Sequence, residues 1–319
     1  MTTLQNNSSL NIADKLARVA DEIGTVIIGK RSTVDLALTA MLCGGHILIE
    51  DIPGVGKTSL AKSLARATGC EFKRVQFTPD LLPADITGSS IYNQRTTEFE
   101  FREGPVFSNI VLADEINRAS PRTQSALLEC MEEQQVTNDG HTYKLPNPFF
   151  VIATENNIES HGTYPLPEAQ LDRFFMRLTM GYPSIDEEIA LLGRRSGQDA
   201  IAALRPVISL EELLDFQKSI HLIHVEKSLY RYIVAITTAT REHPRLALGA
   251  SPRGSISLLH AAQAYAALRN RTYVLPDDIK HLAEPVLSHR IISRSNYGGR
   301  QDTTIEVLKE ILNDTPLEG

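Results

Sequence analysis

The sequence predicts an α/β protein in which a mostly parallel sheet, with helices on both faces, is followed by an all-α domain. Up to residue 183, short apolar runs alternate with segments of helical periodicity. This alternation is typical of buried parallel strands joined by helices. After Tyr182-Pro183 the strand signals stop and only helical segments follow. We therefore expect one domain over 12–183 and a second over 184–319.

The first domain is expected to begin with two helices. Residues 1–11 are polar and rich in Asn and Ser, which predicts a disordered tail. Apolar residues then recur at helical spacing from Ile12 to Ile23, and a second helix is expected over about 32–41. The expected strands are 46–50, 72–77, 110–113, 149–153 and 174–180, with the clearest intervening helices at about 58–68 and 121–134.

Two segments interrupt the alternation and are expected to form hairpins outside the main sheet. Within about 86–107, the run Glu98–Arg102 alternates with period two, like a half-exposed strand. Within about 135–145, Asn138-Asp139-Gly140 is a hairpin-turn signal between two polar runs. The sequence alone is equally consistent with a functional and with a decorative role for these hairpins.

The second domain is expected to contain helices only. Ser209-Leu210-Glu211-Glu212 fits a capping box. Ser251-Pro252 places a capping residue before a proline at the first helical position. The expected helices are 186–196, 209–220, 226–243, 252–270, 276–284 and 303–313.

A glycine-rich loop carries the clearest chemical signal. Strand 46–50 runs into Asp51-Ile52-Pro53-Gly54-Val55-Gly56-Lys57-Thr58-Ser59, where a helix begins. Glycines let backbone N–H groups surround an anion, and the helix N-terminus adds partial positive charge. Lys57 can reach β- and γ-phosphates, and the Thr58 hydroxyl can coordinate Mg²⁺. We therefore predict nucleotide phosphates bound by Pro53, Gly54, Val55, Gly56, Lys57, Thr58 and Ser59. The usual GxxxxGK[ST] pattern begins with Gly, where this chain has Asp51.

Two further strands end in polar residues. Strand 110–113 leads to Asp114, which can hold Mg²⁺, and Glu115, which can polarise a water for attack on the γ-phosphate. Strand 149–153 leads to Asn156, whose amide can orient that water. In isolation these would be ordinary strand ends or turn residues. Since the carboxyl ends of parallel strands face the ligand crevice, we expect them to share one site with the glycine-rich loop.

Two arginines are further candidates. Arg173 directly precedes the last strand, where it can serve a neighbouring subunit's nucleotide or form a surface salt bridge with Asp172. Such an arginine accelerates phosphoryl transfer by about 10³–10⁵ in well-studied cases. Arg253 lies in the first turn of an expected helix, where a cation opposes the helix dipole. A phosphate contact explains Arg253 better, so we expect it to link the helical domain to a nucleotide lying between the two domains.

Composition excludes several other classes of protein. The 319 residues include 39 acidic and 32 basic residues, for a net charge of −7, which disfavours nucleic-acid binding through net positive charge. Cys43, Cys70 and Cys130 form no CxxC pair, which excludes a disulfide scaffold and disfavours a zinc site. No signal-peptide pattern is visible, and no apolar run approaches the ~18–20 residues of a membrane span. We expect a cytoplasmic protein.

In this order, these motifs resemble AAA+ ATPases and, more narrowly, the MoxR family. The narrower resemblance is carried by Gln76–Pro83, Asp114–Ala119 and Gly162–Phe174, and it extends over about 12–315. It implies a P-loop NTPase core with a helical lid, in which the hairpins are the helix-2 insert and the pre-sensor-1 hairpin. It also implies these roles: Lys57 and Thr58 as Walker A, Asp114 and Glu115 as Walker B, Asn156 as sensor 1, Arg173 as arginine finger and Arg253 as sensor 2.

The same resemblance implies a chaperone-like enzyme that uses ATP and Mg²⁺. Such proteins assemble as rings, usually hexamers, and often act with partners that carry a von Willebrand factor A domain in the maturation of protein complexes. A ring also follows if Arg173 points away from its own nucleotide, because repeated head-to-tail contacts can close on themselves. Asp51 departs from the general AAA+ loop, and Glu155 stands where an uncharged residue is more usual.

Two other functions remain open from the sequence. A DNA-directed AAA+ motor would favour basic residues on the hairpins, which here offer chiefly Arg95, Arg102 and Lys144 among acidic neighbours. A nucleotide-dependent binding switch with little turnover would not need the carboxylate of Glu115. Remodelling of a protein client, driven by ATP hydrolysis, is the function that these residues favour.

Overall fold

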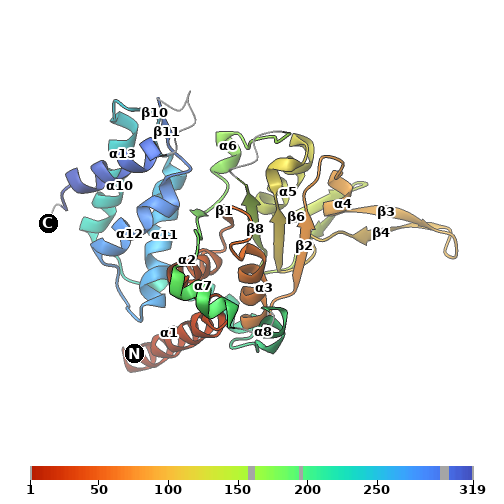
Figure 1. Ribbon diagram of the computed structural model, residues 1–319, viewed down its shortest axis with the longest axis horizontal. Helices are drawn as coiled ribbons and strands as arrows, with labels where there is room; N and C mark the ends of the chain where they lie inside the picture. The colour runs from red at the N-terminus through yellow and green to blue at the C-terminus, as the bar shows by residue number, and fades with distance from the viewer. Residues whose placement is uncertain (1, 157–161, 194–196, 295–301, 318–319) are drawn as a thin grey trace.

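Five parallel strands form the central sheet of the structure, a computed structural model that describes residues 2–156, 162–193, 197–294 and 302–317 (Figure 1). The strand order is β2-β5-β8-β1-β9, and neighbouring strands all pair in parallel. The strands are β1 (Ile47–Glu50), β2 (Phe72–Gln76), β5 (Ile110–Asp114), β8 (Phe150–Glu155) and β9 (Met176–Leu178). This sheet confirms the predicted fold class.

Alternate side chains of each strand point to opposite sides of the sheet, and apolar residues cover both sides, so both faces are buried. Ile47 and Ile110 belong to one apolar cluster, which also takes in the helices α1 (Thr2–Gly24), α2 (Arg31–Leu42) and α3 (Lys57–Ala67). Leu48 and Val111 belong to a second cluster, which includes residues of α5 (Pro121–Glu133). The continuous apolar character of these strands in the sequence reflects this two-sided burial.

The first helix corrects the predicted N-terminal tail. Helix α1 begins at Thr2, so the segment 1–11 that was expected to be disordered is helical from its second residue. No Pro or Gly occurs between Thr2 and Ile23 that would end the helix. The turns that contain Leu16 and Ile23, which are fully buried, anchor this continuous helix to the core.

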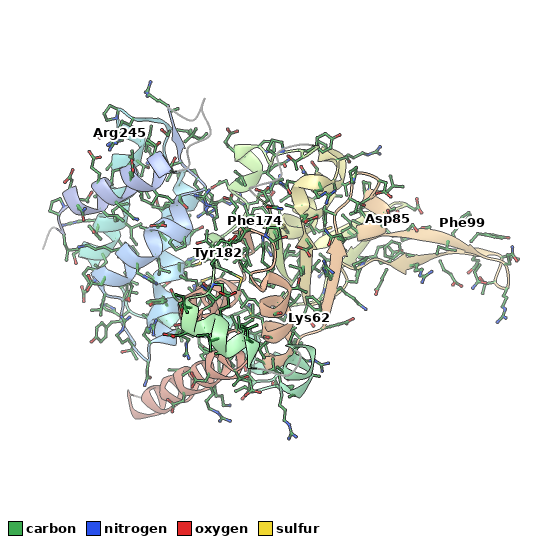
Figure 2. The ribbon with its side chains drawn as sticks, viewed as in Figure 1. Lys62, Asp85, Phe99, Phe174, Tyr182 and Arg245 are labelled. Atoms are coloured by element: carbon green, nitrogen blue, oxygen red, sulfur yellow. The ribbon has the colours of Figure 1, made fainter. Side chains whose placement is uncertain are left out.

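The two polar segments form hairpins outside the sheet. Strands β3 (Gly88–Asn93) and β4 (Glu98–Glu103) follow the short helix α4 (Pro83–Thr87) and project far from the body, with Phe99 on the projecting part (Figures 1 and 2). Strands β6 (Gln135–Asn138) and β7 (His141–Lys144) form the second hairpin. The Phe101 and Tyr143 rings stack with centroids 4.2 Å apart, which joins the two hairpins.

The chain after β9 does not enter the helical lid at once. Helices α7 (Ile185–Leu192) and α8 (Gly197–Ala203) come first, and the Val207 amide after α8 donates to the Ala67 carbonyl of α3 at 2.8 Å. The predicted helix over 186–196 ends earlier, at Leu192, and residues 194–196 lie outside the described part. Helix α8 and the residues that follow it up to 208 therefore lie beside the sheet domain, next to the C-terminal end of α3 (Figure 1).

The lid contains the helices α9 (Leu210–Ser219), α10 (Lys227–Glu242), α11 (Pro252–Leu268), α12 (Pro276–Leu287) and α13 (Asp302–Asp314), with the short turn η2 (Ile220–Leu222). It is not purely helical, because β10 (Leu246–Leu248) pairs with β11 (Ile292–Ser293) in an antiparallel ladder. Strands of three and two residues are too short to leave a periodic signal in the sequence.

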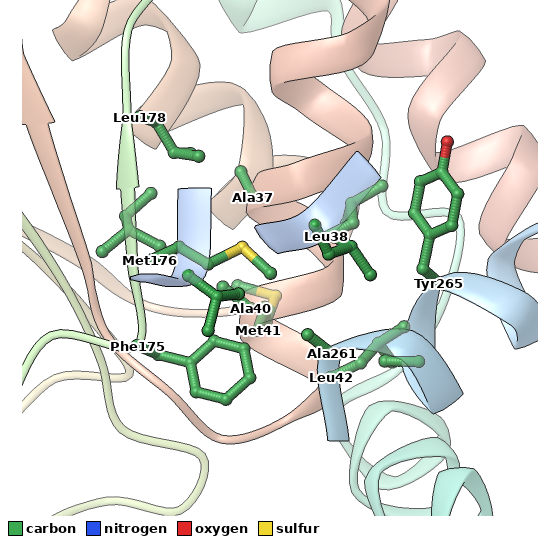
Figure 3. Close-up of a cluster of buried hydrophobic side chains, with 14 of the residues drawn as sticks. Ala37, Leu38, Ala40, Met41, Leu42, Phe175, Met176, Leu178, Ala261 and Tyr265 are labelled. Carbon is green, nitrogen blue, oxygen red and sulfur yellow. The ribbon is translucent and has the colours of Figure 1, made fainter. Parts of the chain in front are cut away.

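Helix α11 packs against α1 and α2, so the lid and the sheet domain share one apolar cluster. Figure 3 shows part of this cluster, with Leu38 and Met41 of α2 beside Met176 of β9 and Ala261 of α11. The N-terminal helices thus hold the lid against the sheet domain. In the described residues, the structure has no helix that is long and apolar enough to cross a membrane.

Candidate functional site

The glycine-rich loop joins β1 to α3 at the carboxyl edge of the sheet. Gly54 and Gly56 have φ angles of +86° and +96°, a left-handed conformation that favours glycine. Helix α3 begins at Lys57, so Thr58 and Ser59 lie in its first turn. Pro53 is exposed, whereas Val55 is half-buried against the apolar core. This backbone has the features of a phosphate cradle: two left-handed glycines followed directly by a helix N-terminus.

The Lys57 ammonium lies across the ends of two strands. Its Nζ donates to the Asp51 carbonyl at 2.6 Å and to the Glu155 carbonyl at 3.0 Å. Burial lowers the pKa of Lys57, while the nearby carboxylates, chiefly Asp51 and Asp114, act in the opposite direction. Lys57 therefore sits where a phosphate above the loop could take over its backbone contacts.

Asp114 ends β5 beside this loop. Its Oδ1 accepts a hydrogen bond from the Thr154 hydroxyl of β8 at 2.7 Å. Its Oδ2 accepts from Nη2 and Nε of Arg74 at 2.7 and 3.0 Å. Neither partner was singled out from the sequence, although Arg74 lies on the strand that pairs with β5. These bonds fix the orientation of the Asp114 carboxylate.

Glu115 follows Asp114 with a left-handed φ of +56°, which turns the chain into the short helix η1 (Ile116–Arg118). Its amide donates to the Thr154 hydroxyl at 2.9 Å, so Thr154 contacts both acidic residues. Its carboxylate Oε2 accepts from Nε2 of Gln76 at 2.9 Å and from Nη1 of Arg118 at 3.2 Å. The Glu115 side chain is thus held in place at the end of the sheet.

Asn156 and Glu155 close this edge at the end of β8. Asn156 is buried, and residues 157–161 after it lie outside the described part. Glu155 is the register partner of Glu50 on β1, and Glu50 pairs with Arg177 of β9 at 3.5 Å. Burial, reinforced by the charge of Glu50, raises the pKa of Glu155 to about 7, while Arg177 and Lys57 oppose the rise.

Arg173 and Arg253 meet at a different place. Nη2 of Arg173 lies 3.2 Å from Oε2 of Glu132, and Nη2 of Arg253 lies 3.3 Å from Oε1 of the same carboxylate. Asp172 lies 2.9 Å from Nε of the buried Arg290, and 4.0 Å from Nη1 of Arg253. Burial lowers the pKa of Arg290 to about 10, against the raising effect of Asp172.

This arginine cluster, Arg173, Arg253 and Arg290 with Glu132 and Asp172, surrounds a cavity of about 190 Å³. His46, which directly precedes β1, also lines the cavity. Arg173 precedes β9, which is parallel to β1. The cluster therefore lies at the amino edge of the sheet, while the glycine-rich loop lies at the carboxyl edge. The four residues of β1 alone separate the two by about 13 Å at 3.3 Å per residue.

The position of Arg253 corrects the expectation that it links the lid to the nucleotide of its own chain. The N-terminus of α11 lies beside Glu132 at the amino edge of the sheet, whereas Lys57 begins α3 at the carboxyl edge. The reason is the packing of α11 on α1 and α2, which places the lid to one side of the sheet domain instead of over the glycine-rich loop (Figure 1). No local sequence pattern predicts that packing.

Comparisons with known proteins agree with this fold. A family model described as "ATPase family associated with various cellular activities (AAA)" matches residues 46–176, and one described as "AAA lid domain" matches 238–311. The chaperone MoxR1 of Mycobacterium tuberculosis is 42% identical over 286 residues, which cover 87% of this chain and 75% of that protein. The chain belongs to the MoxR family of AAA+ ATPases.

Two further relatives match this MoxR-family chain at higher identity or over a larger share of both chains than MoxR1 does. YeaC of Bacillus subtilis, described as uncharacterised, is 55% identical over 277 residues, 87% of each chain. A solved crystal structure of a protein from Cytophaga hutchinsonii is 41% identical and superimposes with a TM-score of 0.90 over 98% of both chains. The MoxR-family architecture therefore extends over nearly the whole chain.

Proposed function

We propose that this MoxR-family protein hydrolyses ATP at a site shared between neighbouring subunits of a ring and uses the cycle to remodel a protein partner. One observation carries the proposal: the predicted nucleotide-binding residues and the two predicted arginines lie at opposite edges of the same sheet. A single chain thus presents the loop, the acidic pair and Asn156 on one side and the arginine cluster on the other.

At the carboxyl edge, residues Pro53–Ser59 would surround the phosphates, with Lys57 on the β- and γ-phosphates. Thr58 and Asp114 offer the hydroxyl and carboxylate oxygens that Mg²⁺ prefers, so this donor set fits a Mg²⁺–nucleotide complex. Bound there, Mg²⁺ would neutralise charge on the phosphate oxygens. Glu115, oriented by Gln76 and Arg118, would polarise the attacking water, and Asn156 would orient it.

At the amino edge, Arg173 and Arg253 would reach the γ-phosphate of the adjacent subunit. Glu132 holds both guanidinium groups on one carboxylate, so they converge on a space that one phosphate could occupy. The contact is head-to-tail, because different edges of the two subunits meet, and a closed ring is its natural product. We expect a hexamer, by resemblance to the MoxR family.

We propose that the client is a protein and, by resemblance to the MoxR family, one that carries a von Willebrand factor A domain. The name of the relative MoxR1, a chaperone, supports this direction. The projecting β3–β4 hairpin carries Glu98, Glu100 and Glu103 beside Arg102, a mixture that does not favour a DNA-directed motor.

Mixing two defective variants tests the shared site. Lys57→Ala subunits should lose their own nucleotide site but still offer Arg173, while Arg173→Ala subunits keep the nucleotide site and lose the arginine. Each variant alone should be inactive, and a 1:1 mixture should regain ATPase activity. In random rings about one quarter of interfaces would pair the two intact halves.

Arg95→Ala, which removes an exposed hairpin arginine outside both edges, is the matched control and should keep full activity. Fully active Arg173→Ala subunits, together with a mixture that gains nothing, would exclude the shared site. The nucleotide-dependent switch is distinguished by wild-type turnover: phosphate release at a steady rate over many cycles rules it out.

A further inference from the structure

Asp51 stands where phosphate-binding loops usually begin with glycine, and the structure gives it an unusual set of contacts. Its carboxylate Oδ2 accepts hydrogen bonds from the Met180 amide at 2.5 Å and the Gly181 amide at 2.7 Å. Its Oδ1 accepts from the Ile52 amide at 2.8 Å. The bonds from Met180 and Gly181 join the start of the glycine-rich loop to the segment between β9 and α7, which lies about 130 residues later.

The backbone of Asp51 is equally engaged. Its amide donates to the Glu155 carbonyl at 3.2 Å, and its carbonyl accepts from the Lys57 ammonium at 2.6 Å. Asp51 therefore contacts the end of β8, the lysine of the loop and the chain after β9 at the same time. No other position in the loop is described with bonds to all three.

The segment 180–182 lies directly against the loop. The Met180 side chain comes within 3.8 Å of the place that a Cβ on Gly56 would occupy. On its other side, the Tyr182 carbonyl accepts from the Lys30 ammonium at 2.8 Å. The segment is thus held between the loop and the N-terminal region, and it leads straight into α7 beside Tyr182 (Figure 2).

Hydrogen bonds to a carboxylate are shorter and stronger than those between neutral groups. A glycine at position 51 would leave the Met180, Gly181 and Ile52 amides without this acceptor. The loop and α7 would then be connected only through packing, and a change in loop backbone would not be transmitted to the amides at 180 and 181.

We propose that Asp51 is a positioning residue that couples phosphate binding in the loop to the segment 180–184 and helix α7. When the loop closes on a phosphate, Asp51 moves with it, and the two amides bonded to its carboxylate carry that movement to α7. The coupling rests on the proposed nucleotide binding, whereas the tie between Asp51 and the two amides does not.

Hydrogen exchange measured by mass spectrometry tests the tie in the nucleotide-free protein. Asp51→Gly should exchange the amides of 180 and 181 at least about tenfold faster than the wild type, because their hydrogen bonds are lost. Asp51→Asn, which keeps one acceptor oxygen, should fall between the two. Asp186→Asn removes a carboxylate from the first turn of α7 without touching the loop and should exchange like the wild type.

The second arm adds saturating non-hydrolysable ATP analogue, with occupancy checked by equilibrium dialysis and folding by thermal melting. Peptides covering 180–192 should gain protection in the wild type and in Asp186→Asn, but not in Asp51→Gly, although all three are loaded. Asp51→Asn provides the same comparison with a smaller change if Asp51→Gly melts early.

An unchanged response in loaded Asp51→Gly and Asp51→Asn would overturn the coupling while leaving the proposed function intact. A wild type that binds no nucleotide would remove both proposals. Equal exchange of 180 and 181 in all four nucleotide-free proteins would overturn the tie itself.

Discussion

The two edges of the central sheet are built differently. At the carboxyl edge, Lys57, Asp114 and Glu115 are held by backbone carbonyls and by side chains from neighbouring strands, chiefly Thr154 and Arg74. At the amino edge, Arg173 and Arg253 come from separate elements and meet on one carboxylate, with about a third to a half of each side chain exposed.

This difference shows how one chain can carry the two halves of the proposed shared site on opposite edges of its sheet. The carboxyl edge has strands whose ends are adjacent by topology, so its groups are organised without a partner. The amino edge presents cations toward solvent around a small cavity, which in the proposed ring would be half of a site. Variants at the carboxyl edge should therefore act within one subunit, and variants at the amino edge should act only after assembly.

The largest expected effect is at the carboxyl edge. Glu115→Gln should lower kcat by about 10²–10⁴, because it removes the carboxylate that we propose polarises the attacking water. ATP binding should persist, since Lys57 and the loop are untouched. Steady-state phosphate release and equilibrium binding of labelled ATP measure the two separately. Unchanged turnover would remove Glu115 from the reaction and weaken the distinction between the edges.

A smaller effect is expected at the amino edge. Glu132→Gln should lower kcat by about tenfold with little change in the KM for ATP. The reason is that Arg173 and Arg253 lose the negative charge that holds their guanidinium groups together. The neighbouring Glu133→Gln on the exposed end of α5 is the control. In an Arg173→Ala, Arg253→Ala background the Glu132→Gln change should add nothing further. A rise in KM instead would place Glu132 in nucleotide binding and contradict the comparison.

A third effect concerns stability and arises from Glu155, at the end of β8 on the carboxyl edge. The pKa of Glu155 is raised to about 7, from 4.5 in the unfolded chain. From pH 4.5 to about 7 the unfolded chain gives up this proton while the folded protein keeps it. The free energy of unfolding should therefore fall as pH rises through this window, by at most about 1.4 kcal/mol per pH unit, and level off above it.

Glu155→Gln removes this ionisation. Urea unfolding at intervals from pH 5 to 8 should show the variant gaining on the wild type up to about pH 7 and keeping a constant difference above it. Glu98→Gln, an exposed carboxylate on the β3–β4 hairpin, should follow the wild-type profile. Parallel curves for Glu155→Gln and wild type would mean that Glu155 is ionised in the folded protein throughout this range.

Much of the carboxyl edge was predictable from local sequence. The apolar runs before Asp114 and Asn156 predict buried parallel strands, and such strands deliver their ends to one edge whatever their order. The supporting residues Arg74, Gln76 and Thr154 could not be found this way, because their roles depend on which strands are neighbours. The register of β2 with β5 places Gln76 opposite Asp114.

The sequence by itself determined the alternation of strands and helices, the left-handed glycines of the loop and the acidic pair at a strand end, since each depends on short-range backbone preferences and periodic burial. Only the tertiary structure decided that Arg253 joins Arg173 on Glu132, and that Asp51 bonds to the amides of 180 and 181. Both depend on packing between segments far apart in the chain, for which local residue patterns carry no signal.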